Sequence, residues 1–378
     1  MKMKILFVNY EYKPQCGGAG FAIYNLASEL HRMGHTVHIL AGWDDAYGKP
    51  ECIQGVHTEF VKIRKKNIHQ STATGMLGFV CRGLWKIYRM TRDFPYDIVQ
   101  FYFSVPTGLL KYGLCGKLPY VVSLRGMDVP GFHKDKYSLL TRIMEPLNRR
   151  IVKEADAVTV LSSEFKKYFQ RFEAGVEPVI IPNGLFLQDF RKKELYQDRL
   201  AKFVSVTRLT SLKKIDVMIK AFIELHKEYD YISLDIYGEG FQREELEKMI
   251  TAGQADAYIT LKGYEDEKVL KKKMCEYDVF ELLTVSDAFG NVFIEAMACG
   301  LPVICAKAGG PCDIVKDHVT GVFVKPGDLG DAVEKMRWCL KHPEQMKQYG
   351  MAGRKRAEEL YSITGVAEQH IRMFEKIV

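Results

Sequence analysis

Residues 286–304 read SDAFGNVFIEAMACGLPVI, and this stretch contains a turn, a complete helix and the entry to a strand. The apolar run Val279–Thr284 before it predicts a strand, and Gly290 predicts a turn that opens a helix at about Asn291. The Gly-Leu-Pro sequence at 300–302 ends that helix before the apolar run Pro302–Cys305. A strand, a helix and a strand within so few residues predict two parallel strands joined by a helix.

The same alternation of short apolar runs and amphipathic stretches extends over nearly the whole chain. Most runs are continuously apolar, which predicts parallel sheets covered by helices on both faces. Helical patterns separate them, as at Phe21–Arg32, Asp216–Glu228 and Ala332–Leu340. We therefore expect an α/β protein with two Rossmann-like, doubly wound domains facing a cleft. The other predicted strands are Lys4–Tyr10, Val37–Ala41, Glu59–Ile63, Asp97–Phe103, Tyr120–Leu124, Ala157–Leu161, Pro178–Pro182, Phe203–Thr207, Ile232–Tyr237, Tyr258–Leu261 and Gly321–Val324.

The boundary between the domains is predicted near residues 185–200, which are charged and carry no strand signal. We expect domains at 1–190 and 200–358, and a C-terminal helix at 359–378 that packs back on the first domain. Ligands of doubly wound sheets bind beyond the carboxyl ends of the strands, so the loops that follow strands are the places to search.

The composition is that of a globular protein, with 47% hydrophobic and 27% charged residues among 378. The sequence holds no run of the roughly 18 apolar residues that a membrane-spanning helix needs, and its first apolar run is too short for a signal peptide. Nine cysteines without a Cys-x-x-Cys pair indicate reduced thiols rather than a zinc site. These features predict a cytoplasmic protein.

The net charge of +7 is concentrated in the first half of the chain. Residues 1–190 hold 25 Lys and Arg against 17 Asp and Glu, a surplus of 8, whereas the remainder holds 29 against 30. An anionic membrane surface or a phosphorylated acceptor fits this surplus. Nucleic acid fits it poorly, because no recognition module for nucleic acid is present.

Two carboxylates and two cations stand on loops that follow predicted strands. Asp287 and Glu295 lie eight residues apart, on either side of the backbone N–H groups that open the helix, and carboxylates accept hydrogen bonds from vicinal sugar hydroxyls. Arg208 and Lys213 follow another strand and together suit a diphosphate. The alternative for both cations is an ordinary solvated surface.

The first loop, at 14–20, contains Gly17, Gly18 and Gly20 before a helix, an arrangement that lets the backbone approach an anion. The dinucleotide fingerprint Gly-x-Gly-x-x-Gly is absent, although Asp44 stands where a ribose-binding acid would lie. A nicotinamide cofactor is therefore disfavoured, and a tight turn without a ligand remains an alternative for this loop.

Residues 286–304 resemble the signature of the retaining glycosyltransferases of family four, which share the two-domain GT-B fold. The resemblance continues through 309–315 and 320–328, the Arg-Leu-x-x-x-Lys pattern at 208–213, the Ile-Pro-Asn-Gly sequence at 181–184 and the opening glycine loop. It implies an acceptor-binding first domain and a second domain that binds a nucleotide sugar. It implies donor binding by Gly17, Gly18, Arg208, Lys213, Tyr264, Gly290, Asn291, Val292 and Glu295, and catalytic roles for Asp287, Arg125 and Asp128.

Three departures from the family pattern affect these expectations. Asp287 replaces a Glu and is one methylene shorter, Lys214 replaces the Gly after the clamp lysine, and Arg125 replaces a His. Arg125 cannot accept a proton, so it would stabilise negative charge instead. Asp128 would bind a sugar hydroxyl or orient Arg125, and the sequence does not decide between these roles.

The resemblance implies transfer of a sugar from a nucleotide diphosphate to a hydroxyl of a glycan or lipid-linked acceptor, with the anomeric configuration retained. No cofactor or metal is expected, because the Asp-x-Asp motif is absent from the chain. Two alternatives stay open: a nucleotide-sugar epimerase of the same fold, and a binding protein without catalytic activity. The basic amphipathic stretch Gly75–Arg92 is interpreted either as a peripheral membrane contact or as an ordinary surface helix.

Overall fold

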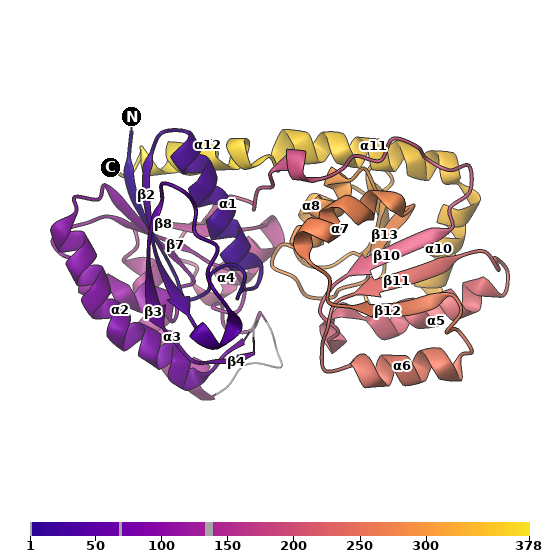
Figure 1. Ribbon diagram of the computed structural model, residues 1–378, viewed down its shortest axis with the longest axis horizontal. Helices are drawn as coiled ribbons and strands as arrows, with labels where there is room; N and C mark the ends of the chain where they lie inside the picture. The colour runs from indigo at the N-terminus through magenta and orange to yellow at the C-terminus, as the bar shows by residue number, and fades with distance from the viewer. Residues whose placement is uncertain (1, 68–69, 133–138) are drawn as a thin grey trace. The chain divides into compact units, whose positions relative to one another are not determined.

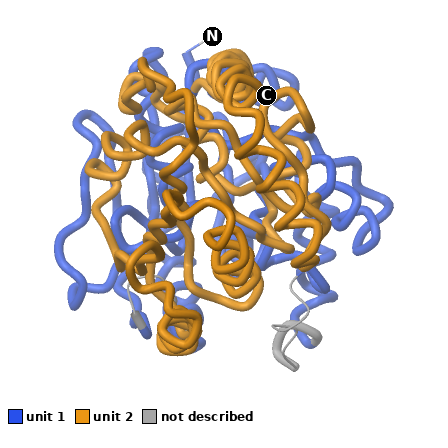
Figure 2. The backbone as a smooth tube through the Cα atoms, turned by 90° about the vertical axis from the view of Figure 1, so that its right-hand side faces the viewer, with its two compact units in different colours: residues 1–184, 363–378 blue, residues 185–362 orange. Residues whose placement is uncertain are grey.

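A computed structural model describes residues 2–67, 70–132 and 139–378. The described chain divides into two compact units (Figure 2), one of residues 1–184 with 363–378 and one of residues 185–362. Each unit is built on its own parallel sheet, so the prediction of two Rossmann-like domains is confirmed. None of the helices in the described ranges combines the length and the apolar character that crossing a bilayer requires.

Unit 1 holds a seven-stranded sheet in the order β3-β2-β1-β6-β7-β8-β9, and every pairing in it is parallel. Its central strands are continuously buried, as the apolar sequence predicts. A short antiparallel pair, β4 (Lys65–Asn67) with β5 (Gln70–Ser71), was not predicted. The strands of the sheet are β1 (Lys4–Asn9), β2 (Thr36–Trp43), β3 (His57–Lys62), β6 (Ile98–Tyr102), β7 (Tyr120–Ser123), β8 (Ala157–Val160) and β9 (Val179–Ile180).

The helices of unit 1 lie on both faces of its sheet (Figure 1), as right-handed crossovers require. α1 and the C-terminal α12 pack together, and the Thr364 hydroxyl of α12 donates a hydrogen bond to Glu29 of α1. α2 lies beside the 3₁₀ helix η2 on the other face. The bounds are α1 (Gly18–Arg32), η1 (Asp45–Tyr47), α2 (Ala73–Asp93), η2 (Thr107–Gly113), α3 (Leu139–Lys153), α4 (Ser163–Phe172) and α12 (Ile363–Phe374).

Unit 2 holds a six-stranded parallel sheet in the order β12-β11-β10-β13-β14-β15. The strand order reverses between β10 and β13, and a switch of this kind is where doubly wound sheets bind ligands. The strands are β10 (Lys202–Val206), β11 (Ser233–Tyr237), β12 (Ile259–Gly263), β13 (Val279–Leu282), β14 (Val303–Ala306) and β15 (Gly321–Val324).

The helices of unit 2 follow its strands in the alternating order predicted from the sequence. α5 and α10 pack together, and α11 packs on α8. The bounds are η4 (Leu187–Asp189), η5 (Ser211–Lys213), α5 (Ile215–His226), α6 (Arg243–Ala252), α7 (Glu267–Lys273), η6 (Met274–Glu276), α8 (Asn291–Ala298), α9 (Pro311–Ile314), α10 (Leu329–Lys341) and α11 (Pro343–Leu360).

Candidate functional site

In unit 2, Lys213 and Asp287 meet. The Lys213 ammonium lies 2.6 Å from Asp287 Oδ2, and both side chains are largely shielded from solvent. The chain that leaves β13 is tied to η5, because the Val285 amide donates to the Leu212 carbonyl at 2.9 Å. The two predicted site residues are therefore held together by the backbone at the switch between β10 and β13.

The loop after β14 supports Asp287 from the other side. The Gly310 amide donates to the Asp287 carbonyl at 2.8 Å, and a Cβ at Gly309 would come within 2.6 Å of that oxygen. A Cβ at Gly310 would lie 2.4 Å from the Cα of Phe289. Only glycines permit this approach, so the Gly-Gly pair at 309–310 fixes the loop that carries Asp287.

The helix α8 begins directly after this loop. Gly290 occupies its N-cap position with a φ of +98°, which favours glycine, and no acidic residue stands in the first turn. The amides of Asn291 and Val292 therefore lie at a helix N-terminus that is suited to an anion. The predicted start of this helix at about Asn291 is correct.

Glu295 lies one turn inside α8 and is half-buried. Burial raises the pKa of its carboxyl to about 7, with a further upward contribution from Glu267 and an opposing one from Lys271. Lys271 is itself paired with Glu267 at 2.6 Å. In this environment the ionised form of the carboxyl is stabilised by hydrogen-bond donors that enter with a ligand, such as the two hydroxyls of a ribose.

Arg208 and Tyr264 lie on loops at the carboxyl ends of β10 and β12. Arg208 is exposed on the loop that also leads to Lys213, and Tyr264 is 67% exposed after Gly263. Lys214, where the family pattern has glycine, adopts a φ of +51° at the N-cap of α5. That left-handed conformation gives a physical reason for glycine at this position in the family.

In unit 1, Arg125 and Asp128 share one loop at the end of β7. Asp128 is buried and accepts the amides of Arg125 at 3.0 Å, Gly126 at 2.9 Å and Ser104 at 3.1 Å. Burial raises the pKa of this carboxyl, while the amide hydrogen bonds oppose the increase. Because both carboxylate oxygens are bound by backbone amides, the geometry favours the role of orienting the loop over that of binding a sugar.

The guanidinium of Arg125 is held by its surroundings. Nη1 donates to Asn183 Oδ1 at 2.6 Å, and the group lies over the Tyr102 ring, 4.4 Å from its centroid. Burial lowers the pKa of Arg125 from its ordinary value. Nearby, His370 of α12 has a pKa of about 4, lowered mainly by burial and further by the charge of Arg125.

A carboxylate also lies beside the glycine loop that precedes α1. The Gly17 amide at the N-cap of α1 donates to Glu11 Oε2 at 3.2 Å, while Gly18 is exposed. Asp44, the alternative ribose ligand, accepts the amides of Ala46 and Lys65 through its two oxygens. Its carboxylate thus caps backbone amides, which further disfavours the nicotinamide alternative.

Several residues near these groups were not predicted. Asn183 belongs to the Ile-Pro-Asn-Gly sequence, which could have indicated it as a partner of Arg125. Glu11, Tyr102 and His370 carry no sequence signal, because only the folded chain brings them to the glycine loop and to Arg125. Lys271 likewise approaches Glu295 only through the packing of α7.

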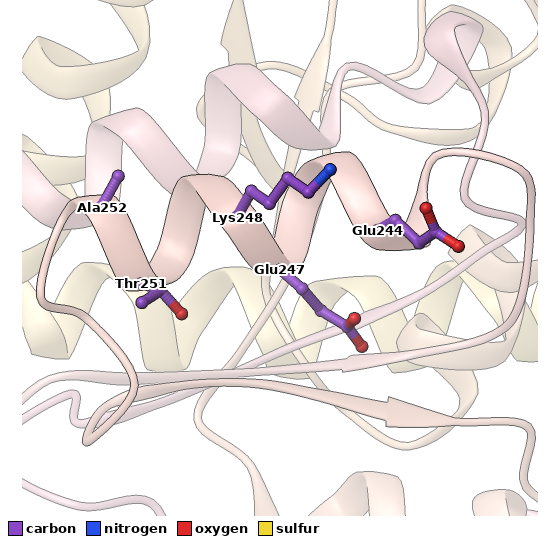
Figure 3. Close-up of a pocket in the computed structure, with 5 residues that line it drawn as sticks. All are labelled: Glu244, Glu247, Lys248, Thr251 and Ala252. Atoms are coloured by element: carbon purple, nitrogen blue, oxygen red, sulfur yellow. The ribbon is translucent and has the colours of Figure 1, made fainter.

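A hollow along α6 (Figure 3) is lined by one helix alone and includes none of the predicted site residues; its lining is Glu244, Glu247, Lys248, Thr251 and Ala252. Within residues 2–67, 70–132 and 139–378, no three His, Cys, Asp or Glu side chains gather as metal ligands would.

Comparison with known proteins matches each unit to a glycosyltransferase family model. The model described as Glycosyltransferase Family 4 matches residues 16–188, and the one described as Glycosyl transferases group 1 matches residues 187–356. A relative from Mycolicibacterium hassiacum, named MMP alpha-(1->4)-mannosyltransferase, is 23% identical, and the alignment covers 100% of this chain and 98% of the relative.

Solved structures of similar fold share less than 20% sequence identity with this chain in the two examples that follow. Sucrose-phosphate synthase from Thermosynechococcus elongatus has a TM-score of 0.83 at 18% identity, covering 99% of each chain. Anabaena HepE in complex with UDP-glucose has a TM-score of 0.76 at 17% identity, covering 99% of this chain and 100% of that one. With matching family models over both units and a matching fold over nearly the whole chain, this protein is a family 4 glycosyltransferase with the GT-B fold.

Proposed function

We propose that this glycosyltransferase moves a sugar from a nucleotide diphosphate to an acceptor hydroxyl, with retention of the anomeric configuration and without a metal. The single observation that carries the proposal is the contact between Lys213 and Asp287 beside the N-terminus of α8. A cation, a carboxylate and a helix N-terminus in one place match a phosphate joined to a sugar. The relative solved with UDP-glucose supports a donor of this class.

The chemistry of each residue at the site indicates its role. Lys213 and Arg208 neutralise the charge that grows on the departing diphosphate. Asp287 accepts hydroxyls of the transferred sugar, and Glu295 accepts the ribose hydroxyls. The bond between the anomeric carbon and the diphosphate oxygen breaks, the acceptor oxygen bonds to that carbon on the same face, and the acceptor proton passes to a donor phosphate oxygen. Lys213 supplies the charge compensation that a metal would otherwise provide.

The acceptor is proposed to be a saccharide or a lipid-linked sugar reached at the cytoplasmic face of a membrane. The basic surplus of residues 1–190 and the half-buried cation at Arg125 suit an acceptor that carries negative charge. Arg125 is positioned by Asn183 and Tyr102, and its guanidinium makes no ion pair among the residues that the structure describes. The Asp128 carboxylate, which is bound by backbone amides, acts on it only through its charge.

A donor panel tests the proposal. Nucleotide sugars are screened for thermal stabilisation of the full chain, and those that bind are then assayed for release of nucleotide diphosphate in the presence of a metal chelator. We expect Lys213→Ala and Glu295→Ala to lower turnover by about 100-fold or more, whereas Lys220→Ala, on the exposed side of α5, retains it. Binding without release would identify a binding protein, and inversion at the sugar carbon would refute retention.

A further inference from the structure

The helix α2 is apolar on two faces, although only one of them is buried. The inner stripe of Gly75, Phe79, Gly83, Ile87 and Met90 packs into unit 1. The opposite side presents Leu77, Trp85 and Tyr88, which are 64%, 62% and 45% exposed. We refer to these three residues as the outer face of α2. Three large apolar side chains on one face of an exposed helix are characteristic of a binding surface.

Each exposed ring at this surface has a cation beside it. The Arg89 guanidinium lies 5.0 Å from the centroid of Trp85, and that of Arg92 lies 5.8 Å from Tyr88. In η2 the Lys111 ammonium lies 4.9 Å from the half-exposed ring of Tyr112, although the Lys111 side chain is itself buried and paired with Glu154. Rings that are apolar in the body and polar at the edge, with long cationic side chains beside them, suit the boundary between lipid chains and headgroups.

The helix η2 adjoins the outer face because its backbone packs closely on α2. A Cβ at Gly113 would lie 2.7 Å from the Leu84 carbonyl oxygen, and the Cys115 amide donates to the Thr91 hydroxyl at 3.1 Å. Tyr112, which is 50% exposed, therefore stands on an element that packs directly against α2.

The charge of α2 is of one sign over twenty residues. Residues 73–92 contain Arg82, Lys86, Arg89 and Arg92 and no acidic residue. Glu59 of β3 is shared by Lys86 at 3.3 Å and Arg89 at 3.0 Å, so that one carboxylate faces two cations. Arg92 pairs with Asp93, and Arg82 donates to the Lys62 carbonyl. The flank of the outer face thus keeps a positive excess.

We propose that the outer face of α2, with Tyr112, docks unit 1 on an anionic lipid bilayer. Leu77, Trp85 and Tyr88 enter the headgroup boundary, and the cations on the flank reach lipid phosphates. A protein partner is the competing occupant, because Trp, Tyr and Arg are also enriched at protein interfaces. The twenty residues 73–92 without an acidic side chain favour an anionic lipid surface over it. The inference rests on the proposed function, since docking delivers the enzyme to a membrane-borne acceptor.

Vesicles provide the test on the full chain. Flotation with phosphatidylcholine vesicles is compared with flotation when part of the lipid is phosphatidylglycerol. We expect binding only with the anionic lipid, weakening as salt is raised. Trp85 is the most exposed of the three tryptophans, with Trp43 buried, so its emission should shift to the blue on binding, and Trp85→Phe should remove the shift.

Matched variants separate this surface from the rest of the molecule. The double variant Leu77→Ala/Trp85→Ala should lower the partition to anionic vesicles by about tenfold or more. The control Leu195→Ala/Met351→Ala alters two exposed apolar residues of unit 2 and should bind as the parent does. Equal binding to neutral vesicles, no binding, or equal binding by both double variants would overturn the inference, as would a change of oligomeric state in the α2 variant alone.

The same samples distinguish failure of the docking surface from failure of the proposed function. Thermal stabilisation by the nucleotide sugar depends on unit 2 and should be unchanged in Leu77→Ala/Trp85→Ala. Loss of vesicle binding with intact donor binding supports the surface. Vesicle binding by a chain that never releases nucleotide diphosphate would instead leave docking established and refute the transferase proposal.

Discussion

The carboxyl of Glu295 is predicted to make donor binding depend on pH. Burial raises its pKa to about 7, so in the free protein about half of the molecules carry a protonated Glu295 at neutral pH. Ribose hydroxyls donate hydrogen bonds most strongly to the ionised form. Binding of the donor therefore requires the release of a proton, and the affinity should rise as the pH increases.

The size of the effect follows from that pKa. If only the ionised form binds, the apparent Kd exceeds its limiting value by about elevenfold at one pH unit below the pKa, and by only about 10% at one unit above it. We therefore expect the Kd to fall by about tenfold between pH 6 and pH 8. The midpoint should lie near pH 7 and should report on Glu295 alone.

Isothermal titration calorimetry measures both the affinity and the proton release. An intact nucleotide sugar is used, because its diphosphate has no free terminal group that titrates in this range. Repeating the titration in buffers with different ionisation enthalpies counts the protons released, which should approach one per donor below pH 7. Glu295→Gln should bind weakly with a Kd that no longer changes with pH.

A second variant tests the origin of the shift. Glu267 raises the pKa of Glu295 and also pairs with Lys271. Glu267→Gln should therefore move the midpoint to lower pH, while Glu358→Gln on α11 should leave it in place. A parent Kd that changes less than about twofold between pH 6 and pH 8 would refute the assignment of Glu295 to the ribose.

Three further predictions concern stability and the site. In a double-mutant cycle of Lys213→Ala and Asp287→Asn, turnover should show strong non-additivity, because each residue positions the other at 2.6 Å; additive losses would contradict a shared role. Buried Glu281 has a pKa of about 8, raised from its unfolded value, so its ionisation should lower the free energy of unfolding by on the order of 4 kcal/mol as pH rises from 5 to 8. The thermal stability of Glu281→Gln should depend less on pH. An equal decline with pH in the variant would contradict this prediction. Gly310→Ala should lower the unfolding temperature and turnover together, because its Cβ would lie 2.4 Å from Phe289 Cα, whereas Gly330→Ala, with its nearest contact at 3.5 Å, serves as the control.

Much of the fold was predictable because its strands are short apolar runs bounded by glycine, proline or charge. Parallel strands buried on both faces need such runs, and the run Val279–Thr284 became β13 within two residues. The pair β4 and β5 was missed because Lys65–Asn67 is polar and has no period-two pattern. Its geometry depends on contacts made elsewhere, such as the Asp44 carboxylate that accepts the Lys65 amide.

The site was predictable where the residues sit next to one another in sequence. The segment from Asp287 to Glu295 is one turn and one helix, so local rules place its amides and carboxylates. Contacts between distant segments were not accessible in this way. The environment of Glu295 includes Lys271 and Glu267, which a periodic pattern identifies only as charges on another helix.

The surroundings of Arg125 explain how unit 1 keeps a cation where the family pattern has a histidine. Burying a guanidinium costs free energy unless its N–H groups have hydrogen-bond acceptors and its charge is compensated. Here Asn183 accepts one donor, the face of Tyr102 lies 4.4 Å away and the Asp128 loop fixes the backbone, while Nε has no hydrogen-bond partner among the residues that the structure describes. The imidazole of His370 does not add to the positive charge, because burial lowers its pKa to about 4 and the ring is therefore neutral at physiological pH. Protonation of both groups would place two buried cations together, so the neutrality of one permits the charge of the other. This arrangement is the physical condition under which Arg125 can serve as a fixed positive charge toward an acceptor.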